Sequence, residues 1–255
     1  RKMAQISSIY TAPVKSFALN EHDHVEVDVH GISEDRRFYV IDAKGHLLTQ
    51  RQKGKLTQIK ACYEEADNLL TLQFPDGNKL SRKIERGIEV ATRIWGRDVK
   101  GHILEGDWIR GLSEFCGEQV SLVISVNPGQ CYDEYPVSLL SAASLNLLQQ
   151  KSGWSGSFNE SRFRPTFFIN NCEAHEEDSW IGRIIGIGDH LKVAVVSRDP
   201  RCAIITHDPT TGLPDTDTLS VIRSYRQNIG PAYFGVYGSV VQSGPVSVGN
   251  DITLL

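Results

Sequence analysis

The chain has 255 residues, a formal net charge of −4 and an isoelectric point near 6.1. It lacks the overall positive charge that is typical of nucleic-acid-binding proteins, and its apolar runs are shorter than the about 18 residues that a membrane-spanning helix needs. The five cysteines are widely spaced, without the CxxC pairs typical of zinc and iron–sulfur sites. We therefore expect a cytoplasmic protein with no nucleic-acid partner and no membrane span, large enough for two domains.

The first half of the chain has the pattern of a β-rich domain. Alternating and β-branched runs predict strands over 4–10 and 25–29 and a hairpin over 36–52, and further short runs continue to residue 105. Apolar residues at helical spacing then predict a short helix that begins after Asp107 and ends at Gly117. We place a domain boundary after this helix, which gives domains over 3–118 and 119–255.

The second half mixes strands with two amphipathic helices. One helix is expected to begin after Ser141 and to end at Gly153, and the other to begin after Asp217. Strands are expected over 166–169, 191–197, 233–241 and 251–255. The predicted fold class is mainly β with a few helices, α+β, with two tightly packed halves.

A cysteine between arginines follows the strand predicted over 191–197. Pro200 has no N–H for strand pairing, so this strand should end before Cys202. Arg198 and Arg201 place positive charge near the sulfur, which favours the thiolate, the form that attacks electrophiles or binds metals. From these residues alone, a half-buried structural cysteine is the commoner alternative.

Three short segments carry groups that suit an anion. Lys15 and Ser16 follow a turn and offer a charge and a directed hydroxyl, the chemistry that a phosphate needs. The free N–H groups at the helix start near Ser141 and Ser144 are suited to an anion without any basic side chain. Arg164 precedes a strand and could point into a pocket. A solvated lysine turn and an ordinary helix start are the simpler alternatives.

Three further segments are interpreted from residue spacing: the Arg36–Arg37 pair, the acidic segment 173–178 and the glycines of 182–188. Arg36 and Arg37 begin a predicted strand, and because neighbouring residues on a strand point to opposite faces, only one of them should face inward. The acidic segment 173–178 contains a histidine but no helical HExxH pattern, so it is predicted to be a solvated loop and not a metal site. The glycines of 182–188 do not form a GxGxxG dinucleotide motif.

Several segments, in this order, resemble the MOSC family, which is named for the C-terminal domain of molybdenum cofactor sulfurases. The similarity is greatest to its two-domain members, the mitochondrial amidoxime-reducing components and bacterial relatives that reduce N-hydroxylated compounds, and it covers Ile6 to Leu255. The segments are APVKS, DRRFYV, LSAASL, RFRPTFFI, EDSW, RCAIITHDPTTG, SYRQ and FGVYGSVV through ITLL.

The resemblance implies a molybdenum cofactor (Mo-molybdopterin) bound between an N-terminal β-rich domain and a MOSC β-barrel, and not pyridoxal phosphate. By motif position, Cys202 is the implied molybdenum ligand and catalytic residue. The implied cofactor-binding residues are Lys15, Ser16, Arg37, Ser141, Ser144, Arg164, Thr166, Arg201 and Tyr237. Two departures stand out, because relatives have asparagine where this chain has Thr166 and serine where it has Pro200.

The implied activity is a molybdenum-dependent reduction of N-hydroxylated compounds such as amidoximes, hydroxylamines and N-hydroxylated bases. The chain carries no flavin, nicotinamide or iron–sulfur motif, so electrons should come from a separate flavin or haem protein. A cofactor or sulfur carrier without turnover, or a barrel that has lost the cofactor, would share these residues and stays an alternative.

Overall fold

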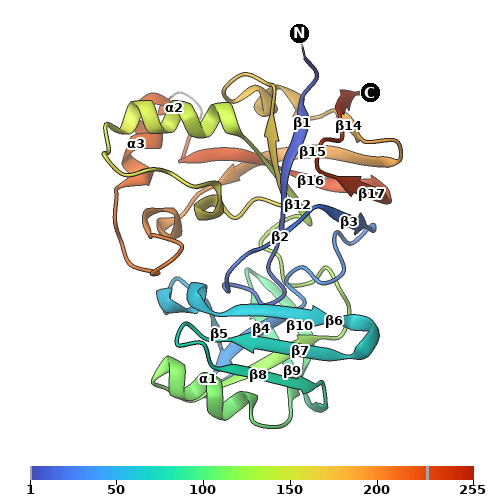
Figure 1. The fold of residues 1–255 in the computed structure, drawn as a ribbon, viewed down its shortest axis with the longest axis vertical. Helices are drawn as coiled ribbons and strands as arrows, with labels where there is room; N and C mark the ends of the chain where they lie inside the picture. The colour runs from blue at the N-terminus through green and yellow to red at the C-terminus, as the bar shows by residue number, and fades with distance from the viewer. Residues whose placement is uncertain (1, 228–229) are drawn as a thin grey trace.

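The computed structural model describes residues 2–227 and 230–255. Its described residues form mainly strands with three short α-helices, which confirms the α+β class (Figure 1). One half is built around an eight-stranded sheet with helices beside it, and the other around a five-stranded and a three-stranded sheet.

The eight-stranded sheet is antiparallel except for one parallel pair, β12 with β13. A separate two-stranded ribbon pairs β3 (His24–Val27) with β17 (Gly244–Ser247). The strand order of the large sheet is β18 (Ile252–Leu254), β14 (Ile184–Ile187), β15 (Leu191–Pro200), β16 (Tyr233–Gln242), β12 (Val137–Ser141), β13 (Phe167–Asn170), β1 (Gln5–Thr11) and β2 (Asn20–His22).

The other half contains two antiparallel sheets and the helix α1 (Trp108–Cys116), which packs on β11. The five-stranded sheet has the order β5 (Leu47–Leu48), β4 (Phe38–Asp42), β11 (Val120–Ser125), β10 (Arg97–Leu104) and β9 (Arg86–Ile94). The three-stranded sheet has the order β6 (Lys60–Glu64), β7 (Leu69–Gln73) and β8 (Lys79–Lys83).

The two halves share strands across residue 118. β1 lies near the start of the chain but pairs with β13 in the eight-stranded sheet, with Ile9 opposite Phe167. In the opposite direction, β11 follows the predicted boundary but pairs with β4 and β10 of the five-stranded sheet. The chain therefore crosses between the halves more than once (Figure 1).

The expected β-barrel is not confirmed as a continuous closed sheet. Within the described residues, the continuous strand order of the large sheet runs from the three-residue strand β18 to the three-residue strand β2. Three register shifts between β15 and β16 bend and twist the longest pair of this sheet. The curved sheet brings β18 to the start of β1, where the N–H of Ile252 donates to the carbonyl of Ala4 at 2.7 Å and Gln5 forms an isolated bridge with Asp251.

The predicted helix starts are confirmed, and two of the three predicted side-chain caps form. Helix α2 (Ala142–Ser152) begins after Ser141, whose hydroxyl accepts a hydrogen bond from the N–H of Ser144, and it ends at the left-handed Gly153. Helix α3 (Thr218–Tyr225) is capped by Asp217. Asp107 stands at the start of α1 but makes no cap hydrogen bond, because its carboxylate accepts from Arg82 at 3.0 Å.

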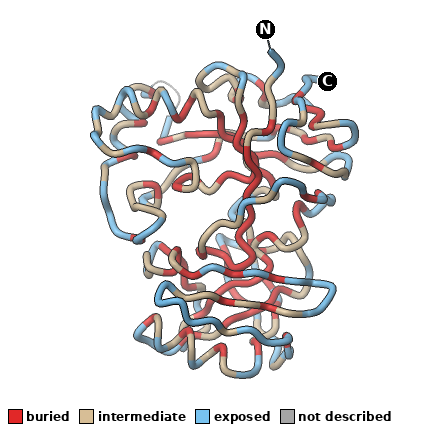
Figure 2. Tube along the Cα trace, viewed as in Figure 1, coloured by how far each residue is buried: buried red, intermediate tan, exposed pale blue. Residues whose placement is uncertain are grey.

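Each half has its own apolar core, shown as buried backbone in Figure 2. In the eight-stranded sheet, neighbouring side chains point to opposite faces, so Leu139 packs in one cluster and Leu140 in the other. The Leu140 face also contacts apolar side chains of α2 and α3, including Leu148 and Ile222. Together with the shared strands, these cores fix the segments that meet between the halves.

Candidate functional site

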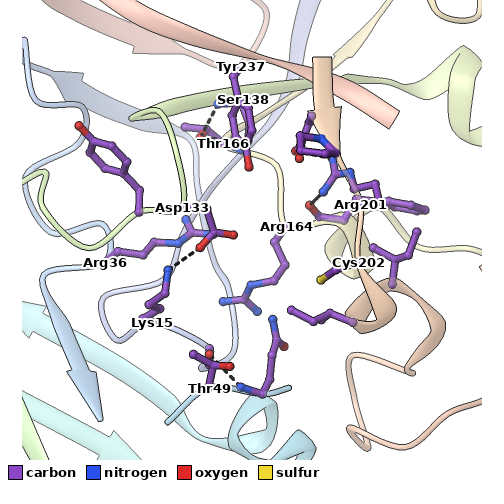
Figure 3. A pocket seen from close by; sticks show the side chains of 18 of the residues that line it. Lys15, Arg36, Thr49, Asp133, Ser138, Arg164, Thr166, Arg201, Cys202 and Tyr237 are labelled. Atoms are coloured by element: carbon purple, nitrogen blue, oxygen red, sulfur yellow. Dashed lines mark hydrogen bonds and ion pairs between the residues drawn. The ribbon is translucent and has the colours of Figure 1, made fainter. Parts of the chain in front are cut away.

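A pocket lies where the two halves meet, lined by polar and charged side chains from both (Figure 3). The first half contributes Lys15, Ser16, Asp35, Arg36, Thr49, Gln50, Arg51 and Trp95, and the second half contributes Tyr135, Ser138, Arg164, Thr166, Asp199, Arg201, Cys202 and Tyr237, among others. Most of the predicted site residues are therefore brought together here.

Cys202 lies at the end of strand β15. The strand ends at Pro200, as predicted, and the short 3-10 helix η5 (Ala203–Thr206) begins directly after the cysteine. The Cys202 side chain is half-buried and lines the pocket. By contrast, Cys131 is buried in a core cluster, and burial raises the pKa of its thiol to about 11. Among the described cysteines, only Cys202 lines this pocket.

Six basic side chains line the pocket, and carboxylates neutralise four of them within the described part of the chain. Arg51 and Arg164 are the two that have no ion-pair partner there. The four pairs are Lys15 with Asp133 at 2.6 Å, Arg36 with Asp35 at 2.6 Å, Arg201 with Asp199 at 2.8 Å and Arg162 with Asp215 at 2.6 Å.

Arg164 holds a central position in the pocket, between Lys15 and Cys202 (Figure 3). It adopts a left-handed backbone, with φ 52°, at the end of the 3-10 helix η3 (Glu160–Phe163), and one guanidinium nitrogen donates to the carbonyl of Phe17 at 2.7 Å. Burial lowers the pKa of Arg164 to about 9. A half-buried cation without a carboxylate partner favours an anion in the pocket.

Lys15 is buried, and its ammonium already has two acceptors. It donates to the carbonyl of Cys131 at 2.8 Å and to Asp133 at 2.6 Å. Burial lowers the pKa of Lys15. Desolvation alone would raise the pKa of Asp133, but the Lys15 charge and the hydrogen bonds from Lys15 and Trp95 together outweigh it and lower this pKa. An anion that reaches Lys15 must therefore displace or share with Asp133.

The hydroxyls of Ser16 and Thr166 accept hydrogen bonds from backbone N–H groups of neighbouring segments. The hydroxyl of Ser16 accepts from the N–H of Gln50 at 3.0 Å, across the loop that follows β5. Thr166 exchanges hydrogen bonds with Ser138, each hydroxyl accepting from the other residue's N–H at 3.1 and 3.0 Å. These contacts fix the positions of two pocket walls.

Arg201 holds the cysteine loop in place. Its guanidinium donates to the carbonyls of Phe234 and Phe163 at 2.8 and 2.7 Å and pairs with Asp199. Burial raises the pKa of Asp199 to about 7, although Arg201 opposes the shift. Tyr237 hydrogen-bonds to the same carboxylate, and burial raises its pKa as well.

The structure places Arg36, and not Arg37, in the pocket. Arg37 is buried in the first half, where it donates to the carbonyls of Ser125 and Val126 at 3.3 Å each. The alternation rule failed because β4 begins only at Phe38 and Arg36 has a left-handed backbone, with φ 48°. No sequence pattern marks that conformation at an arginine.

Ser141 and Ser144 lie outside the pocket. Both are fully buried at the start of α2, where the N–H of Ser141 and the hydroxyl of Ser144 donate to the Glu177 carboxylate at 3.2 and 3.1 Å. The donor groups that this helix start offers are therefore occupied by the protein's own Glu177 side chain. These two serines are therefore not part of the proposed cofactor site.

The solvated-loop prediction for 173–178 is wrong. Glu177 is fully buried, and Asp178 is paired with Arg226 and, at 3.5 Å, with Arg198. The segment forms the 3-10 helix η4 (Glu176–Trp180), which packs against β12, β15 and β16. No group of three or more metal-ligating side chains was found in the described ranges 2–227 and 230–255.

Several pocket residues were missed by sequence reasoning. Asp133 and Tyr135 lie in an irregular polar segment, and Trp95 lies in a hairpin turn. The only signal for them was the density of aromatic and acidic residues between 132 and 135. Asp199 was passed over beside the more conspicuous Arg201 and Cys202.

Comparison with known proteins identifies the family. Two relatives are human mitochondrial amidoxime reducing component 2, 26% identical over 99% of this chain and 84% of its own length, and human component 1, 25% identical over 100% and 84%. Among solved structures, the YuaD protein from Bacillus subtilis matches with a TM-score of 0.48 and 13% identity, over 98% of this chain and 94% of its own.

No helix in the described part of the chain is long and apolar enough to span a bilayer. The MOSC N-terminal beta barrel domain matches residues 3–119, and the MOSC domain matches residues 125–253. The human amidoxime reducing components are similar to this chain over nearly its whole length. With both domains matched, the chain belongs to the two-domain MOSC family.

Proposed function

We propose that the pocket binds a molybdenum cofactor and that the protein reduces N-hydroxylated compounds, as the names of its amidoxime-reducing relatives suggest. The observation that carries the proposal is the pairing of two chemistries in one pocket. A half-buried thiol, Cys202, and an arginine without a carboxylate, Arg164, line the same space between the halves. A soft thiolate suits a molybdenum ion, and a guanidinium suits a phosphate.

The residues present fit this cofactor. Cys202 would hold the metal, and Arg164 would bind the phosphate end together with Arg36, Lys15 and Ser16. Three further pocket residues would position the site without contacting the cofactor, because their polar groups fix the cysteine loop and the neighbouring strands. They are Arg201, Thr166 and Tyr237. Arg36 takes the place that the sequence had given to Arg37.

The bound cofactor would supply a two-electron metal centre for reductive cleavage of the N–O bond. The net reaction breaks the N–O bond, consumes two electrons and two protons, and releases the N–H product and water. Asp199 lines the pocket with a pKa near 7, so its carboxyl can hold one of these protons at neutral pH. The electrons would come from a separate flavin or haem protein, in a cytoplasmic setting.

A metal-loaded preparation tests the proposal. With reduced viologen as donor, it should convert benzamidoxime to benzamidine over many turnovers. The Cys202→Ala variant should keep its fold and lose the metal–thiolate absorption and the activity, because one half-buried side chain is removed from the pocket and none from a core. Full activity in Cys202→Ala would refute the ligand assignment, and cofactor binding without turnover in the wild type would favour a carrier.

A further inference from the structure

Arg51 is the second pocket arginine without an ion-pair partner among the described residues. It lies in the loop after β5 and is exposed at the rim, whereas Lys15 and Arg36 are deeper, with side chains only 9% and 14% exposed. Both of these deeper cations are paired with carboxylates, Lys15 with Asp133 and Arg36 with Asp35. Arg51 is therefore a separate positive charge at the entrance.

The guanidinium of Arg51 is held against an aromatic ring. Its central carbon lies 4.4 Å from the ring centroid of Trp95, which also lines the pocket and stays 42% exposed. This cation–π contact orients the arginine and leaves its N–H groups without a carboxylate. The pair combines a flat apolar surface with a positive charge.

Trp95 is held in a defined position at the tip of a hairpin. It stands at the tip of the β9–β10 hairpin with φ 44°, an uncommon conformation for a bulky residue. Its indole N–H donates to Asp133 at 2.8 Å, and Arg97 in the same hairpin donates to the carbonyls of Gln130 and Asp133 at 3.0 and 2.9 Å. Trp95 and Gly96, with φ 44° and 88°, form the two-residue turn of this hairpin, and the bond to Asp133 fixes the indole ring at the pocket rim.

We infer that Arg51 and Trp95 form an outer subsite that binds the acidic group of a planar aromatic N-hydroxylated substrate, an inference that rests on the proposed function. The aromatic ring of such a substrate would lie along the rim beside Trp95, Tyr132 and Tyr135, with its N–O group directed toward Cys202. A carboxylate or a phosphate on the ring would meet Arg51.

The test compares two probes, benzamidoxime and 4-carboxybenzamidoxime, the second of which adds an anionic carboxylate to the ring. In wild-type protein loaded with cofactor, kcat/KM for the acid should exceed that for the neutral compound. In Arg51→Gln the acid-to-neutral ratio should fall about fivefold, as for an ion pair in contact with solvent. The wild-type ratio should also fall as ionic strength rises.

Arg93→Gln is the matched control. Arg93 lies in the same hairpin, two residues before Trp95, but it pairs with Asp98 at 3.1 Å and does not line the pocket. Its ratio should equal that of the wild type. Trp95→Leu, which removes the stacking surface, should lower the ratio in the same direction as Arg51→Gln.

A readout without turnover separates this inference from the proposed reaction. Binding of both amidoximes to oxidised, loaded protein without a donor can be measured by calorimetry. Tighter binding of the acid that depends on Arg51, without any reduction, would refute the proposed reaction and keep the subsite. An unchanged ratio in Arg51→Gln, or a loss of cofactor content in that variant, would overturn the inference, because the second result makes Arg51 a cofactor anchor.

Discussion

Two glycines, one from each half, make a backbone contact beside the pocket, and substituting either should loosen the junction. Gly54 begins the 3-10 helix η1 (Gly54–Gln58), and Gly212 lies in the loop after η5. A Cβ on Gly54 would lie 2.1 Å from the carbonyl oxygen of Gly212, and a Cβ on Gly212 would lie 2.2 Å from that of Gly54. Neither position can accept alanine without a backbone shift.

The magnitude follows from two separable costs. Forced overpacking costs about 1–3 kcal/mol, and a left-handed alanine costs about 1–2 kcal/mol. Gly212 has φ 73°, so Gly212→Ala should incur both, about 2–5 kcal/mol, whereas Gly54→Ala should incur mainly the overpacking cost. Gly117→Ala is the matched control, because φ is 70° there and no atom lies within 4 Å of the added Cβ.

Urea unfolding of the three variants gives the free energies, and cofactor content after expression under limiting molybdenum gives the functional consequence. Gly212→Ala and Gly54→Ala should both lose cofactor, because Gln50, whose N–H donates to Ser16, precedes Gly54 and would move relative to Arg164. Gly117→Ala should keep its cofactor. Equal destabilisation and equal cofactor content in Gly212→Ala and Gly117→Ala would show that the backbone at the Gly54–Gly212 contact can shift without cost. That result would refute the predicted overpacking.

Two further predictions concern charge. Arg164→Gln should lower cofactor affinity by about ten- to a hundredfold, as expected for the loss of a charge-assisted contact of about 1.5–3 kcal/mol, measured as cofactor retained during dialysis; unchanged retention would contradict the phosphate role. His175 has its pKa lowered to about 4 by burial and by Arg226, so the unfolded state binds its proton more readily and stability should fall as pH drops from about 6.5 to 4. His175→Gln should flatten that decline by about 1–3 kcal/mol in urea unfolding; an equal slope in both proteins would exclude His175 as its source.

Local patterns predicted the parts of this fold that depend on local chemistry. The Ser141 and Asp217 caps and the end of β15 at Pro200 follow from side-chain capping and from a missing N–H, which act over a few residues. The burial of Glu177 was out of reach, because its partners lie 33 and 36 residues earlier in the chain. A carboxylate in a polar segment looks solvated until the helix start that binds it is in place.

Contacts between residues far apart in sequence also limited the prediction of the site. Cys202, Lys15 and Arg164 were predicted through a family resemblance, and the structure does bring all three to one pocket. The exchange of Arg37 for Arg36 depends on one backbone angle, and the pairing of Lys15 with Asp133 joins residues 118 apart. The sequence cannot show which arginines lack an ion-pair partner, because this depends on where each carboxylate lies in the folded chain.

The path of β1 explains why the pocket lies between the halves. β1 pairs with β13 in the eight-stranded sheet, and the chain then enters the first half, where Val14 bridges to Phe38 and the N–H of Ala12 donates to Asp35 at 2.8 Å. Lys15 and Ser16 follow directly, so their backbone is tied to both cores within a few residues. Because one continuous segment is fixed on both sides, the two halves cannot separate without breaking strand pairing, and the basic groups of the pocket are held in position before any ligand binds.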